Sequence, residues 1–141
     1  MINPTDNELN EVLARVAGAD RVEKRQILFT DYIVMEKEVD CYVTKGGQYI
    51  CDVESWAPLH DANQMERVEE WLEKHKPQRF TWTMKFINSG ISEPRYGVML
   101  ERFDDELCEH KNWYAENTDK KRAFALAVWA WWNEQKKEKA T

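Results

Sequence analysis

The segment that most constrains the fold is the apolar run AFALAVWAWW, which covers residues 123–132. It follows a threonine and a basic triplet, and three tryptophans lie within its last four residues. As a helix, ten residues rise about 15 Å, whereas a membrane crossing takes about 20 apolar residues. We therefore predict that this run does not span a membrane and forms the inside of a small domain.

On a helical wheel, Phe124, Val128 and Trp131 share one side of this run, and alanines fill much of the rest. A helix that is apolar nearly all round is buried, and small alanines let a neighbouring element approach closely. The pattern predicts a central core helix, capped by Thr118 and ending near residue 135. The use of part of this helix as an oligomer or partner surface stays open as an alternative.

The remaining sequence fits one domain, because 141 residues are too few for two ordinary ones and 43% of them are hydrophobic. We predict a single domain over 1–141 with a frayed tail at 136–141. The net charge of −6 disfavours binding to duplex nucleic acid. An odd number of cysteines and the absence of an apolar leader indicate a cytoplasmic protein.

Local signals place two further helices and two hairpins. Thr5 and Glu8 have capping-box spacing before an apolar stripe, and Asp61 precedes a second stripe, which predicts helices over 5–17 and 61–75. The core helix covers 119–135. Gly46-Gly47 joins two runs rich in β-branched residues, which is typical of a hairpin.

Strict alternation in FTWTMKFIN predicts a strand over 80–87, and a turn then leads to an antiparallel partner over 96–103. The polar segment 104–117 reads as a loop or a short irregular strand. Residues 19–38 are ambiguous: their first half suits a loop or a helix, and the stretch ILFTDYIVME at 27–36 is rich in β-forming residues. The order is therefore helix, hairpin, helix, hairpin, helix. The predicted fold class is α+β, with a mostly antiparallel sheet sandwiched by helices.

Four stretches carry a resemblance to a known family: NELNEVLARVAG, YICDVESWAPLHDANQMERVEEWLEK, FTWTMKF with YGVMLERF, and DKKRAFALAVWAW. Together they resemble the phage ABA sandwich domain family of small phage and prophage proteins. The resemblance implies an antiparallel sheet sandwiched by helices and makes residues 21–38 an insertion. It implies no catalytic residues.

Metal and nucleophile patterns are weak. Cys41 and Cys51 flank the hairpin, and Cys108 with His110 forms C-x-H, but structural zinc sites usually bring close C-x-x-C pairs. A Cys108–His110 dyad lacks any marked third member. We predict no metal, no cofactor and no enzymatic activity, with a hydrolase of unrecognised type as an alternative.

Acidic residues gather after the strand at 96–103: Glu101, Asp104, Asp105, Glu106 and Glu109. They form either a solvated face or an acidic surface that engages a basic groove on another protein. In the phage setting, we predict a non-catalytic accessory protein that binds a host protein in the host cytoplasm and inhibits an antiviral defence system.

Two tryptophans, Trp56 and Trp113, stand in polar contexts and are candidates for anchoring a partner or stacking on a base. They support an alternative function, a sponge that sequesters a signalling nucleotide. The triplet at Lys120, Lys121 and Arg122 is similar to the basic helix start of double-stranded RNA-binding domains. The acidic segment before it and the tryptophans after it depart from that family, so we expect no duplex binding.

Overall fold

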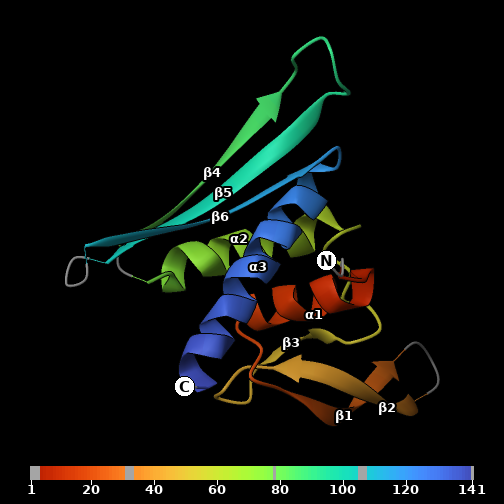
Figure 1. Cartoon of the computed structure of the whole chain (residues 1–141). Coiled ribbons are helices and arrows are strands. Elements are labelled where there is room, and N and C mark those ends of the chain that lie inside the picture. The colour runs from red at the N-terminus through yellow and green to blue at the C-terminus, as the bar shows by residue number, and fades with distance from the viewer. Residues whose placement is uncertain (1–3, 31–33, 78, 105–107, 141) are drawn as a thin grey trace.

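The computed structural model describes residues 4–30, 34–77, 79–104 and 108–140. Three helices and six strands follow one another in these parts of the chain (Figure 1). The elements are α1 (Asp6–Val16), β1 (Arg21–Thr30), β2 (Val34–Val43), β3 (Tyr49–Asp52), α2 (Ala62–His75), β4 (Phe80–Ile87), β5 (Arg95–Asp104), β6 (Glu109–Asn117) and α3 (Lys120–Ala140).

The strands form two antiparallel sheets of three strands each. Sheet A has the order β1-β2-β3, and sheet B has the order β4-β5-β6. The helices gather between the two sheets (Figure 1), so that each sheet has an open face. The predicted single sheet sandwiched by helices is therefore wrong. The reason is that α3, apolar nearly all round, packs on sheet B with one side and on α1 with another.

The predicted order of helix and hairpin is also wrong, because each hairpin gains a third strand. Residues 21–38 supply β1 and the first part of β2. Residues 109–117 form β6, where only every second side chain points toward the helices and the others are polar and exposed. A polar edge strand of this kind has the composition of a loop, which is why the sequence left a loop and a short irregular strand as alternatives here.

The three helices lie where the capping residues and apolar stripes predict them. At the start of α1 the Thr5 hydroxyl accepts a hydrogen bond from the Glu8 N–H at 3.2 Å. At the start of α2 the Asp61 carboxylate accepts from the Asn63 N–H at 2.9 Å. These bonds satisfy N–H groups that have no partner within the helix.

The cap of α3 differs from the prediction by one residue. Asp119, and not Thr118, accepts the hydrogen bond from the Lys121 N–H, at 2.9 Å. The helix then continues to Ala140 instead of ending near residue 135. A carboxylate at this position also interacts favourably with the positive end of the helix dipole.

The centre of the core is the predicted helix. Phe124 and Val128 are fully buried, and Trp131 is 4% exposed. Phe124 meets the edge of Trp82 from β4, with 5.1 Å between the ring centroids, and Trp131 lies 4.9 Å from Phe80. The strands at 80–87 and 96–103 are likewise confirmed as β4 and β5. No helix within the described residues has the length and apolar content that a membrane crossing demands.

Candidate functional site

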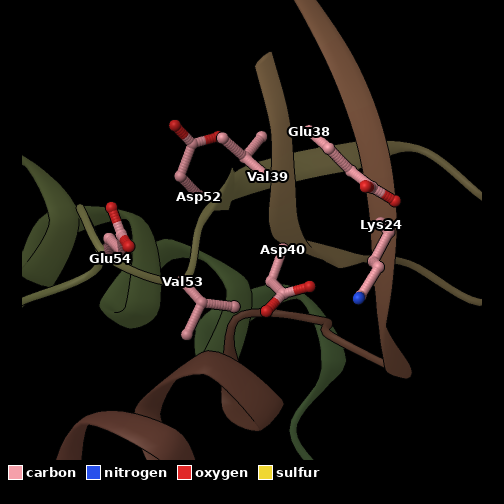
Figure 2. A pocket seen from close by; sticks show the side chains of 7 residues that line it. All are labelled: Lys24, Glu38, Val39, Asp40, Asp52, Val53 and Glu54. Atoms are coloured by element: carbon pink, nitrogen blue, oxygen red, sulfur yellow. The ribbon is translucent and has the colours of Figure 1, made fainter.

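A cavity of about 210 Å³ opens beside sheet A, at the point where β3 ends next to β2. Figure 2 shows the side chains that line it, which come from β1, from β2, and from the end of β3 and the turn after it. They comprise four carboxylates, one amine and two aliphatic groups: Lys24, Glu38, Val39, Asp40, Asp52, Val53 and Glu54. We call this set the acidic pocket.

The local hairpin geometry produces this pocket. The last residue of β3, Asp52, lies opposite Cys41 of β2. One residue further on, the Val53 N–H donates to the carbonyl of Asp40 at 2.9 Å, and the chain then turns away. β2 begins several residues before the part that pairs with β3. Its acidic residues Glu38 and Asp40 therefore lie next to the place where β3 ends, and the pocket opens there.

Hydrogen bonds fix the carboxylate of Asp52 at the rim. The Tyr49 hydroxyl donates to it at 2.9 Å, and the Cys41 thiol lies 3.6 Å from the same oxygen. Partial burial of the phenol and this hydrogen bond to Asp52 raise the pKa of Tyr49 to about 12. Burial also raises the pKa of the Cys41 thiol, which is fully shielded from solvent. Both groups therefore stay protonated at neutral pH and act as donors to a carboxylate.

The charges of the pocket favour a cation. The lining contains four carboxylates and one amine, and Lys24 lies directly opposite Asp40 in the β1–β2 register. Val39 and Val53 add apolar surface to the lining. An arginine or lysine side chain suits such a site, since its aliphatic stem packs on apolar groups while its charged end pairs with carboxylates.

The acidic residues predicted as a partner surface are divided by sheet B. In the register of β5 and β6, Asp104 lies opposite Glu109, and Glu101 lies opposite Asn112. Side chains alternate along a strand, so Glu101 points to the open face while Glu109 points to the other. Asp105 and Glu106 lie outside the described residues. Glu101 and Glu109 therefore do not share one acidic face.

The two candidate tryptophans are part of the core. Trp56 is 5% exposed, and its indole N–H donates to the carbonyl of Asn10 at 2.7 Å. Trp113 is 7% exposed, and its indole N–H donates to the Glu134 carboxylate. Neither ring offers a face on which a base could stack in this conformation.

The basic start of α3 is partly neutralised within the chain. Arg122 contacts the Asp6 carboxylate of α1 at 2.7 Å, and this hydrogen bond holds the pKa of Asp6 below its ordinary value. The side chain of Lys120 acts electrostatically on Glu69 of α2. The basic residues at the start of α3 therefore interact with acidic residues of α1 and α2 and stabilise the packing of the helices.

The cysteines lie apart from one another. Cys41 shares a face of sheet A with Asp52, while Cys51 lies opposite Tyr42 on the other face. Cys108 is exposed and precedes β6. Across the described ranges, no group of three or more His, Cys, Asp or Glu side chains has the arrangement needed to hold a metal ion.

The residues of the acidic pocket were missed by sequence reasoning. All four acids stand in or directly beside the two β-rich runs that flank Gly46-Gly47, and the pairing of β2 with β3 brings these positions to one end of sheet A: Glu38, Asp40, Asp52 and Glu54. A high density of acids on both arms of one hairpin was the available signal. It does not by itself distinguish a solvated edge from a pocket.

Comparisons with known proteins find a similarity among curated proteins. No protein-family model matches the chain, and no solved structure matches it. Among curated proteins, the chain is similar to isopentenyl-diphosphate Delta-isomerase II of Clarkia xantiana, with 24% identity over 116 residues. The match covers 75% of this chain and 37% of the isomerase. The chain thus spans little more than a third of the length of the curated relative that it matches.

Proposed function

We propose that the chain is a non-catalytic binding protein whose acidic pocket receives a basic side chain of a protein partner. The observation that carries this proposal is the lining of the pocket, in which four of the seven residues carry carboxylates, two are valines and one carries an amine. A negative, concave and partly apolar surface complements an arginine or lysine in both charge and shape.

Two features support binding over catalysis at this place. The thiol of Cys41 is fully buried, and burial raises its pKa, so it is neither accessible nor activated as a nucleophile. The Asp52 carboxylate accepts a hydrogen bond from Tyr49, which pre-organises it as an acceptor for a cationic group.

The charge of the acidic pocket also argues against an anionic ligand. A nucleotide or a diphosphate, such as the one in the name of the similar isomerase, carries negative charge that four carboxylates repel. The nucleotide sponge loses its stacking groups as well, since Trp56 and Trp113 are both buried. We therefore do not extend either activity to this chain.

The resemblance to phage proteins gives the proposal its setting. The partner is then a host protein with a basic surface, met in the host cytoplasm, and occupation of that surface inhibits an antiviral defence system. The net charge of −6 favours such an encounter, because long-range attraction raises the rate of association with a basic partner.

The test uses short capped peptides that contain arginine, lysine or the neutral isostere citrulline, titrated into the ¹⁵N-labelled chain. We expect arginine and lysine peptides to shift the amide signals of Asp40 and Asp52, and citrulline to leave them in place. The variant Asp40→Asn/Asp52→Asn should abolish the shifts. The control Glu66→Gln/Glu70→Gln removes the same charge from the exposed face of α2 and should keep them.

Higher salt should weaken the arginine response, because partly exposed charges are screened over about 10 Å at 0.1 M. Equal shifts from citrulline and arginine, or equal loss in the pocket variant and the α2 control, would contradict the proposal.

A further inference from the structure

The free edge of β4 differs from every other sheet edge in the described parts of the chain. Sheets expose unpaired N–H and C=O groups at their outermost strands, and proteins protect such edges with charges, prolines, bulges or short length. The outermost strands here are β1 and β3 in sheet A and β4 and β6 in sheet B. Three of the four carry such protection.

The protection of those three edges can be read from their sequences. β1 carries four charged residues in its first five positions, and β6 carries three charged residues and a histidine. β3 is only four residues long. In contrast, β4 is the eight-residue strand FTWTMKFI, with Lys85 as its single charge and no proline. Its pairing with β5 runs from Phe80 to Ile87 without a register shift.

The half of β4 near the turn is also poorly covered. Phe86 is 58% exposed, and Ile91 in the turn is 96% exposed. Figure 1 shows this end of the β4–β5 hairpin extending beyond the helices. An exposed, regular and apolar edge of this length is a template for another strand.

We propose that β4 pairs with β4 of a second copy of the chain, antiparallel and about a two-fold axis at Met84, so that the two B sheets form one continuous sheet. A two-fold axis perpendicular to the sheet keeps both helix layers on the same side, and it makes the contact self-complementary. On the helix side, Trp82 of each copy then meets the exposed ring of Phe86 in the other.

This register is also compatible with the charges. Centring on Met84 places Lys85 of one copy opposite Thr83 of the other, so that no like charges face each other. Aromatic pairs and Thr–Lys neighbours are favourable or neutral cross-strand partners. The indole N–H of the half-buried Trp82 donates to the Glu73 carboxylate of α2 at 2.8 Å. This bond holds the Trp82 ring on the helix side of β4, which is also the side of Phe86 in the other copy.

The experiment measures the monomer–dimer equilibrium of the full chain by sedimentation equilibrium, from low micromolar to near-millimolar concentration. Thr83 is exposed on the open face, so its replacement leaves the core intact. Thr83→Lys places a second positive charge opposite each Lys85 and should raise the dissociation constant about tenfold, whereas Thr83→Glu should lower it several-fold. Asn112→Lys puts the same charge on exposed β6 and should change nothing.

Hydrogen exchange gives an independent readout, since dimer formation should slow the exchange of outward-pointing β4 amides as concentration rises. A chain that sediments as a monomer at every concentration overturns the proposal, as does an equal response to Thr83→Lys and Asn112→Lys. If Thr83→Glu weakens the dimer as much as Thr83→Lys, the register centred on Met84 is wrong.

Discussion

Replacing Phe124 by alanine tests whether α3 is the centre of the core. The ring is fully buried and meets the edge of Trp82 at 5.1 Å. Burying a phenylalanine side chain stabilises a protein by about 3 kcal/mol, and an edge-to-face pair adds about 1 kcal/mol. The sum of about 4 kcal/mol lies within the range of about 3–5 kcal/mol seen when buried phenylalanines are truncated. Such a loss is a large part of the total stability of a domain, which is about 5–15 kcal/mol.

The assay is urea denaturation followed by tryptophan fluorescence and circular dichroism, with Phe86→Ala as the matched control. Phe86 carries the same side chain but is 58% exposed, so its truncation should cost below about 1 kcal/mol. The denaturant slope should be unchanged in both variants. If Phe124→Ala lowers the free energy of unfolding by no more than Phe86→Ala, the central role of α3 is refuted.

Three further changes have defined outcomes. Gly18→Ala should destabilise the fold by more than about 1 kcal/mol in the same assay, because Gly18 has φ of +101° and an added Cβ would lie 2.6 Å from the indole nitrogen of Trp71. The raised pKa of Tyr49 means that the folded state holds this proton more tightly than the unfolded chain. Its contribution to stability is therefore complete below pH 10.0 and is lost as the pH rises toward about 12, a loss that Tyr49→Phe should remove from the unfolding profile. The lowered pKa of Asp6 has the opposite sign: its contribution is present above the ordinary pKa of 3.8 and is lost as the pH falls, and Arg122→Gln should raise the pKa in an NMR titration.

Helices were predictable because their signals are local. The hydroxyl of Thr5 and the carboxylate of Asp61 act on N–H groups two or three residues away, so sequence spacing alone reveals them. β4 was predictable for a related reason, since its alternation of large apolar and polar side chains is uninterrupted. β6 was predicted only as the alternative to a loop, because its core contribution comes mainly from Trp113 and Ala115 in an otherwise polar strand.

The acidic pocket depends on register, which the sequence constrains weakly. The hairpin at Gly46-Gly47 was predicted, and the structure confirms it. A bulge between Tyr42 and Val43 then sets which residues of β2 meet β3. A shift by one residue moves a side chain to the other face, so Cys41 meets Asp52 instead of Cys51. The site therefore follows from a pairing detail that composition does not encode.

The tryptophans at the end of α3 show which force decides the interior of this domain. Within the described residues, the buried indole N–H groups of Trp131 and Trp132 have no hydrogen-bond partner. An unsatisfied buried donor costs about 1–3 kcal/mol. The ring of Trp131, which is 4% exposed, also removes about 150–250 Å² from water, which at about 25 cal/mol per Å² contributes about 4–6 kcal/mol. Burial therefore outweighs the lost hydrogen bonds, and a helix crowded with tryptophan is stable inside a small domain even where its polar atoms are left unpaired.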